Sequence, residues 1–163
     1  MRTLPIADGG DGTAETLPRA FNGIMRAVNV TAPDGRKIAA EYGVLTSFGE
    51  KTACAAAVIE MAKASGLALM DENALDPLSA TSRGTGELIA SALNEGIRNI
   101  LIGIGGSATN DGGMGAAAAL GVKFLDAEGN ELSGCGRELV LVRKIDLSGL
   151  RRDVFEAKIT VMC

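Results

Sequence analysis

Three segments of different character follow one another between residues 99 and 121. Residues 99–104 form a continuous apolar run bounded by glycine, which is typical of a strand buried in a parallel or mixed sheet. The alanine-rich residues 114–120 end at Gly121 and predict a helix. Because ligands of open α/β sheets bind beyond the carboxyl ends of strands, the loop GIGGSATNDGG between them is the first place to expect a site.

The remaining segments continue this alternation of strands and helices. Two runs that alternate apolar and polar residues, 28–32 and 38–44, flank the turn Pro33-Asp34-Gly35 and predict a β-hairpin. Helical spacing ending at Gly96 predicts a helix at 85–95. We also expect strands at 122–125 and 158–162 and a helix at 139–145. Periodicity does not divide residues 52–69, although a strand ending at Glu60 before a short helix fits them.

These elements predict an α/β fold: a mixed or mostly parallel sheet with flanking helices and a β-hairpin. A chain of 163 residues with 47% apolar residues can bury one core, so a single domain is the expectation. No apolar stretch approaches the roughly 20 residues of a membrane helix, and no signal peptide is apparent, so we expect a cytoplasmic protein without a membrane partner. The three cysteines are expected to be reduced thiols.

Charge and residue usage exclude several functions. The net charge is −4, with only one tyrosine and four phenylalanines, so the basic, aromatic surface of a nucleic-acid binder is missing. The sequence contains no histidine, which excludes serine and cysteine triads based on histidine and most catalytic zinc sites. Acid and base chemistry must therefore fall to carboxylates, lysine, tyrosine or cysteine.

The loop after the buried strand is the strongest candidate for a phosphate site. Glycines allow backbone N–H groups to approach an anion, and the following helix adds partial positive charge. Hydroxyl, amide and carboxylate groups lie in the same loop, at Ser107, Thr109, Asn110 and Asp111. The alternative is a tight strand-to-helix turn, in which the glycines serve close packing and Asp111 caps the helix.

Two further motifs carry charged side chains. In ADGGDGT, Asp8 and Asp11 can hold Mg²⁺ or accept the proton of a substrate hydroxyl, unless both only cap their own turn. In TSRGTGEL, Arg83 can clamp a carboxylate or phosphate at a helix start, beside Thr85. The alternative for Arg83 is a solvated surface charge.

Two familiar nucleotide motifs are matched only in part. The spacing Gly103-x-Gly105-x-x-Ala108 fits a permissive dinucleotide fingerprint, with Asp126 as a candidate ribose acceptor, but the same spacing recurs from Gly113 inside a predicted helix. The stretch at 49–52, GEKT, lacks the Gly-Lys pair of a phosphate-binding loop.

In sequence order, the motifs ADGGDGT, VIEMAKASGLAL, TSRGTGELI and IGIGGSATNDGGMGAAAALGVKFLDAEGNEL closely resemble the type I glycerate kinase family. The resemblance covers nearly the whole chain. It implies ATP-dependent phosphorylation of D-glycerate to a phosphoglycerate, dependence on Mg²⁺, and a two-domain α/β architecture with the active site in the cleft. Phosphoryl transfer of this kind needs positioning and charge neutralisation rather than histidine.

Carried over to this sequence, the resemblance assigns roles to individual residues. Asp8 and Asp11 belong to the acidic cleft motif, where one of them orients or deprotonates the acceptor hydroxyl; Asp11 is also the metal-ligand candidate. Arg83 and Thr85 lie on the glycerate side. The loop faces the cleft, with Gly105 and Gly106 toward the cofactor and with Ser107, Asn110 and Asp111 toward the substrate.

The sequence departs from the family pattern at both ends. Family members begin with a strand and an Asp-Ser-Phe-Lys-Gly type loop and continue after the last strand with an Asp and Asn-Pro segment. We therefore expect residues 1–27 to be a remnant of the nucleotide-side domain and residues 28–163 to resemble the second domain, active only when completed. Exposed strand edges would favour association, including homo-oligomers. The alternatives are a dinucleotide-binding oxidoreductase domain and an inactive, kinase-derived binding module.

Overall fold

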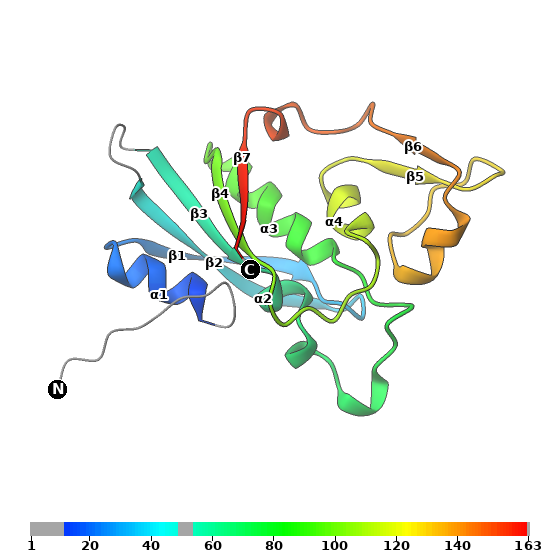
Figure 1. Ribbon diagram of the computed structural model, residues 1–163, viewed down its shortest axis with the longest axis horizontal. Coiled ribbons are helices and arrows are strands. Elements are labelled where there is room, and N and C mark those ends of the chain that lie inside the picture. Colours follow the sequence, from blue (N-terminus) through cyan, green and yellow to red (C-terminus); the bar gives the residue numbers. More distant parts are fainter. Residues whose placement is uncertain (1–11, 49–53, 163) are drawn as a thin grey trace.

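The computed structural model describes residues 12–48 and 54–162 (Figure 1). Five strands form one sheet in the order β1-β2-β3-β4-β7. Strand β2 pairs antiparallel with β1 and β3, whereas β4 pairs parallel with β3 and β7. The bounds are β1 Ile24–Thr31, β2 Lys37–Phe48, β3 Cys54–Glu60, β4 Asn99–Gly103 and β7 Lys158–Met162. The mixed sheet and the β1–β2 hairpin confirm the predicted fold class.

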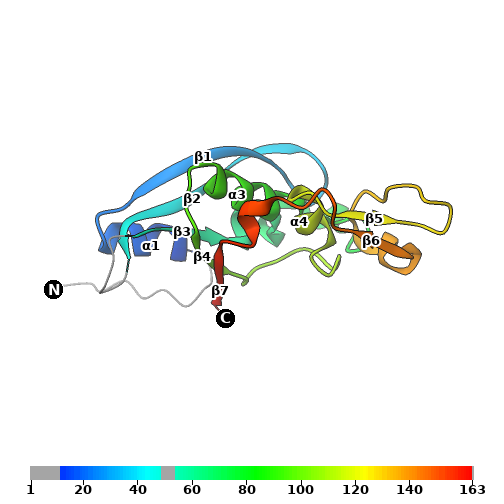
Figure 2. The ribbon, with the colours of Figure 1, turned by 90° about the horizontal axis from the view of Figure 1, so that it is seen from above.

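Helices cover both faces of this sheet. Helix α3 packs on one face and α1 on the other, α2 follows β3 directly, and α4 lies against α3. A second sheet pairs β5 with β6 at the end of the molecule far from α1 (Figures 1 and 2). The bounds are α1 Thr13–Ala20, α2 Met61–Ser65, α3 Arg83–Asn94, α4 Met114–Ala119, β5 Lys123–Leu125 and β6 Lys144–Asp146. The short 3₁₀ helices are η1 Leu67–Leu69, η2 Glu72–Ala74, η3 Gly136–Leu141 and η4 Arg152–Val154.

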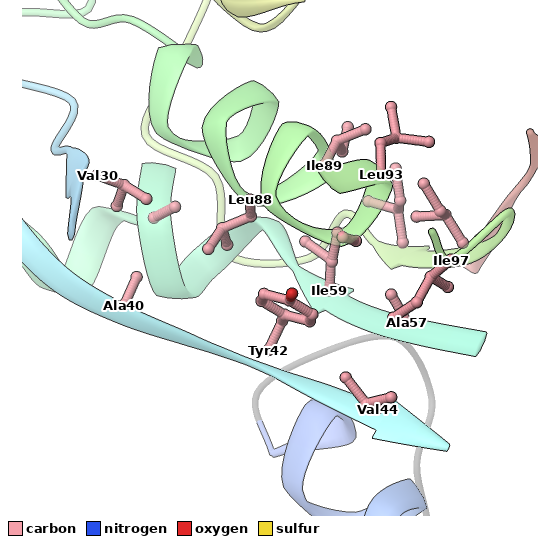
Figure 3. Close-up of a cluster of buried hydrophobic side chains, with 14 of the residues drawn as sticks. Val30, Ala40, Tyr42, Val44, Ala57, Ile59, Leu88, Ile89, Leu93 and Ile97 are labelled. Atoms are coloured by element: carbon pink, nitrogen blue, oxygen red, sulfur yellow. The ribbon is translucent and has the colours of Figure 1, made fainter. Parts of the chain in front are cut away.

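The core lies mainly between the sheet and α3 (Figure 3). Alternation along the strands directs Ala57 and Ile59 of β3 toward α3, while Ala56 and Val58 face α1 on the opposite side. Tyr42 is fully buried, and its hydroxyl donates to Glu95 Oε1 at 3.0 Å. Burial raises the pKa of Tyr42, so this hydroxyl remains protonated and available as a donor.

Helices α3 and α4 approach closely through glycine. A Cβ added at Gly86 would lie 2.3 Å from the carbonyl oxygen of Ala116, and one at Gly115 would lie 2.2 Å from Thr81 Oγ1. Such distances exclude any larger side chain without a shift of the backbone. Gly86 of TSRGTGEL and Gly115 of the loop-to-helix segment therefore serve packing. The structural alternative predicted this role for the second segment only.

Most predicted elements are confirmed, and the undivided segment is resolved. The predicted helix at 85–95 corresponds to α3, and Gly96 ends it with a φ of +79°. The strands predicted near 99–104, 122–125 and 158–162 correspond to β4, β5 and β7, and the helix predicted at 114–120 to α4. Within residues 52–69, β3 ends at Glu60 and α2 begins at Met61.

The helix predicted at 139–145 is wrong. Those residues divide between the 3₁₀ turn η3 and strand β6, which pairs with β5. Leu139, Val140, Leu141 and Ile145 are all exposed, so no apolar face of this segment is buried to hold a helix. Instead, backbone pairing with β5 sets the conformation of residues 144–146.

Two other predictions concern the division of the chain into two units and the absence of a membrane helix. The boundary between residues 27 and 28 falls inside β1, and the division of the chain into two units stays a prediction. No helix within the described ranges is long and apolar enough to cross a membrane.

Candidate functional site at the carboxyl edge of the sheet

The predicted site residues lie around the carboxyl ends of the parallel strands. Glu60 ends β3, Gly103 ends β4, and the two are paired in register. Gly103 also pairs with Met162 near the end of β7. Three parallel strands therefore end at one edge of the sheet, which is the edge where α/β proteins bind ligands.

The loop after β4 is held against the segment after α2. Leu67 N–H donates to the Gly106 carbonyl at 2.9 Å, and Ala108 N–H donates to the Ser65 carbonyl at 2.9 Å. Gly106 has a φ of +70°, a left-handed conformation that glycine adopts without strain. Gly105 and Gly106 are exposed, so their backbone is open to a ligand.

The polar groups of this loop differ in accessibility. Ser107 and Asn110 are exposed, and Ser107 Oγ accepts the Thr109 N–H at 3.1 Å. Ser107 and Asn110 line a cavity of about 260 Å³ together with residues of the η1 to Ala80 segment. Both side chains remain candidates for substrate contact, and that role stays a prediction.

Asp111 is only 1% exposed and has an internal role in this geometry. Its Oδ2 accepts hydrogen bonds from Ser82 N–H and Ser82 Oγ, both at 2.7 Å, and from Gly115 N–H at 3.1 Å, while Oδ1 accepts from Gly113 N–H at 3.1 Å. Ser82 Oγ in turn accepts the Ala116 N–H at 3.0 Å. These bonds tie the start of α4 to the start of α3, which favours the capping alternative for Asp111 over direct substrate contact.

The two candidate residues of the TSRGTGEL motif, Arg83 and Thr85, also differ in accessibility. Thr85 is buried, and its Oγ1 lies 2.8 Å from Ser65 Oγ, so its hydroxyl joins α3 to the end of α2. Arg83 begins α3, and its half-exposed guanidinium lies 3.8 Å from Glu87 Oε1. That long contact leaves most of its donors available, whereas Thr85 would need a rearrangement to reach a ligand.

Asp8, Asp11 and the rest of the ADGGDGT turn up to residue 11 lie outside the described residues, but the helix that follows them is described. Gly12 is the N-cap of α1 with a φ of +90°, and Ala14 N–H donates to Glu60 Oε1 at 2.5 Å. The acidic motif therefore leads into a helix whose first turn is bonded to the end of β3. Sequence reasoning names Glu60 only as a strand end; its signal is a single carboxylate after an apolar run.

An open groove of about 1190 Å³ adjoins the loop. It is lined by Ala27, Ala39 and Glu41 of the hairpin, by Lys63 and Leu67 near α2, and by Gly106. Its volume exceeds the roughly 300 to 1,000 Å³ of typical ligand pockets. Lys63 Nζ donates to Glu15 Oε1 at 3.0 Å, and this bond lowers the pKa of Glu15. The edge of the sheet thus offers a wide groove with one candidate phosphate loop on its rim.

The alternative dinucleotide site depends on Asp126, which is engaged elsewhere. Its Oδ1 accepts the backbone N–H groups of Glu128 and Asn130, and its Oδ2 accepts the Asn130 side chain at 3.0 Å. Asp126 lines neither cavity that contains loop residues. The residue closes a turn after β5 instead, so the oxidoreductase alternative loses its candidate ribose acceptor.

Comparison with known proteins gives a consistent result. The family model described as the glycerate kinase family matches residues 1–163. Glycerate 2-kinase of Escherichia coli K12 is 50% identical over 161 residues, covering 99% of this chain and 41% of that protein. Glycerate kinase of Bacillus subtilis 168 is 46% identical over 162 residues, again covering 99% of this chain and 41% of the relative.

A solved structure agrees with the sequence matches. The crystal structure of a candidate glycerate kinase 2 from Salmonella typhimurium LT2 has a TM-score of 0.89 at 46% identity, covering 98% of this chain and 42% of that one. The chain therefore spans about two fifths of the length of the curated relatives that it matches. Sequence motifs, fold and site geometry lead to one conclusion: the chain belongs to the glycerate kinase family.

Proposed function

We propose that this chain forms the acceptor side of an enzyme that transfers the γ-phosphoryl group of ATP to D-glycerate. The observation that carries the proposal is the exposed loop of residues 104–110 at the carboxyl ends of β3 and β4, beside the groove of about 1190 Å³, in a chain of this family. Family membership supports the assignment of kinase activity. The substrate, the cofactors and the product are parts of the proposal.

In this proposal the described residues divide into two groups. Gly105 and Gly106 offer open backbone to a phosphate, and Ser107 and Asn110 offer side-chain hydrogen bonds to the substrate. Arg83, with its half-exposed guanidinium, would neutralise a carboxylate or phosphate. Asp111 acts through the backbone N–H groups that it accepts, and Thr85 through its bond to the Ser65 hydroxyl, so we revise their role from substrate contact to positioning.

The acid and base chemistry would fall to Asp8 and Asp11. One of them accepts the proton of the glycerate hydroxyl as its oxygen bonds to the γ-phosphorus and the bond to ADP breaks. Mg²⁺ would neutralise charge on the phosphates. Within the described residues no group of three Asp, Glu, Cys or His side chains could hold a metal ion, so the metal proposal depends on Asp11.

The proposal also covers the reaction product, the cellular location, the partners and the oligomeric state. The name of the E. coli relative assigns phosphorylation to the 2-position, and we extend that to this chain as 2-phosphoglycerate. A cytoplasmic location, a small-molecule partner without nucleic acid or membrane, and a homo-oligomeric state are parts of the same proposal.

The test is D-glycerate-dependent release of ADP from Mg-ATP by the 163-residue chain, after circular dichroism has shown that it is folded. Asp11→Asn should lower kcat by about 100-fold or more, because a general base contributes roughly 10² to 10⁴. The matched control is Asp146→Asn, which removes a partly exposed carboxylate that accepts the Ser148 N–H and should change kcat less than twofold. Phosphorus NMR of the product would separate 2- from 3-phosphoglycerate. A folded wild-type chain without turnover would show that the chain is not an enzyme by itself and would leave its family function to measurements of D-glycerate binding.

A further inference from the structure

The groove and the smaller cavity meet at the loop after β4. Gly106 lines the groove of about 1190 Å³, and Ser107, the next residue, lines the cavity of about 260 Å³. Three residues of the segment between α2 and α3 line both spaces: Leu67, Met70 and Leu75. This segment leaves the rest of the molecule after α2 and returns at α3 (Figure 1). The two spaces are therefore neighbours with a shared wall, and the peptide between Gly106 and Ser107 lies where they meet.

The two spaces differ in size and in chemistry. The cavity is small, and its lining carries the polar side chains of Asp76, Ser107 and Asn110, which suits a small polar molecule such as glycerate. The groove is several times larger, and its walls are mostly apolar. Among the described residues that line it, the charged side chains are Glu41, Lys63 and Glu72. Because glycerate would leave most of this groove empty, a larger ligand with an apolar or aromatic part is the better match.

The part of the groove at the loop can bind an anion. The N–H groups of Gly105, Gly106 and Ser107 donate to no acceptor within the described residues, and all three residues are exposed. Gly106 has a left-handed φ of +70°, and successive N–H groups around such a residue form an anion-binding concavity. The lining of the groove also includes Lys63 of α2. The groove therefore combines apolar walls with a cation and open backbone donors.

The ion pair between Lys63 and Glu15 is weak enough for a phosphate to compete with it. Lys63 Nζ donates to Glu15 Oε1 at 3.0 Å, and the two side chains are 38% and 47% exposed. Ion pairs this open to solvent contribute little to stability. The phosphates of a nucleotide carry more negative charge than one carboxylate, so Lys63 can serve them in the groove.

We propose that the groove binds an adenine nucleotide: the base and the ribose lie on its apolar walls, and Lys63 with the N–H groups of the loop binds the phosphates. The phosphoryl group then lies at the peptide between Gly106 and Ser107, with glycerate in the cavity beyond it. The reaction in this statement rests on the proposed function, whereas nucleotide binding is measured without turnover. The inference assigns the nucleoside to this chain, not to the separate nucleotide-side domain expected from the sequence.

Two leucines of the segment between α2 and α3 provide a matched pair of variants. Leu75 lines the groove and is 49% exposed, whereas Leu78 is 57% exposed and lines neither the groove nor the cavity. Leu75→Ala and Leu78→Ala make the same chemical change on the same segment. Because both side chains are about half exposed, neither substitution should unfold the chain.

The first measurement is isothermal titration calorimetry of the full 163-residue chain with ADP and with adenosine, in the absence of glycerate. Leu75→Ala should weaken both ligands by the same factor, roughly threefold to tenfold, because it removes apolar contact with the nucleoside that they share. Leu78→Ala should change either affinity by less than about twofold, since its side chain lies outside the groove. Equal affinity of wild type and Leu75→Ala for adenosine would overturn the placement of the nucleoside.

The second measurement repeats the titrations with variants of the phosphate end. Lys63→Met should weaken ADP about tenfold and leave adenosine nearly unchanged, because adenosine carries no phosphate. Arg19→Met is the control, since it removes another positive charge that acts on Glu15 but is absent from the groove lining. Glu15→Gln should strengthen ADP binding about twofold, because it removes a competitor for Lys63. Unchanged ADP affinity in Lys63→Met would overturn the assignment of the phosphates.

Binding and turnover together separate this inference from the proposed function. A folded chain that binds ADP and adenosine with the expected pattern of variants, yet shows no turnover, supports the groove assignment and counts against the chain as an enzyme by itself. Turnover with a KM for ATP that neither Leu75→Ala nor Lys63→Met changes would overturn the groove assignment and leave the proposed function standing. A folded chain that binds neither ADP nor adenosine would also overturn the inference.

Discussion

The five-stranded sheet with its helices, called the body below, matches the elements predicted from the sequence more closely than the β5–β6 end does. In the body, most apolar residues of β2, β3, β4 and α3 meet in the main core between the sheet and α3, and most of the predicted elements are confirmed. In the region from β5 to η4, several large apolar side chains face solvent, and one predicted helix is wrong. An apolar pattern predicts an element reliably where the same chain buries that pattern, because burial supplies most of an element's stability.

The largest expected effect contrasts one buried and one exposed apolar side chain. Leu88→Ala in α3 removes a side chain that is 0% exposed and should lower the free energy of unfolding by about 4 kcal/mol, through lost burial and a residual cavity. Val140→Ala in η3, where the side chain is 74% exposed, should change it by less than about 0.5 kcal/mol. Urea unfolding measures both. Similar losses for the two variants would show that the β5–β6 end is covered in solution and break the comparison.

The next effect contrasts two aspartates with similar bonding. Asp111→Ala would leave four donors of Ser82, Gly113 and Gly115 without their acceptor, three of them in buried bonds, and should lower the free energy of unfolding by about 3 kcal/mol. Asp126→Ala removes a comparable number of bonds at an exposed turn, where water replaces the carboxylate, and should cost much less. Thermal and urea unfolding of both variants would test this. An Asp111→Ala chain as stable as wild type would refute the internal role assigned to Asp111.

The smallest effect concerns acid pH and the β5–β6 end. A hydrogen bond from Asn130 lowers the pKa of Asp126, and one from Arg151 lowers the pKa of Asp153. A carboxyl whose folded pKa is lowered contributes stability above its unfolded pKa, near 4, and loses it as the pH falls through the folded value. We therefore expect amides of β5 and β6 to lose protection below about pH 4 before those of β3 and β4. Simultaneous loss in both sheets would mean that the two regions unfold as one unit.

Much of the candidate site could be expected from the sequence, but its internal division could not. The glycine-rich loop follows a predicted strand, so its place at the carboxyl edge required no knowledge of distant contacts. Asp111 and Asn110 are neighbours with similar polar character, yet one is buried and bonded to Ser82 while the other is exposed. That difference arises because α3 meets α4 at Gly115, a contact between segments about 30 residues apart.

The sequence by itself determined most strands and helices of the body, the hairpin and the family, since each depends on local periodicity, turn residues or a continuous motif. It left residues 52–69 undivided and predicted no helix at Thr13–Ala20. Only the tertiary structure decided which polar groups are free to meet a ligand. The capping of α1 by Glu60 is the clearest case, because the two ends of that bond lie 46 residues apart and neither carries a local signal for the other. Local chemistry specifies elements, whereas the packing of elements decides which side chains are buried, paired or left open.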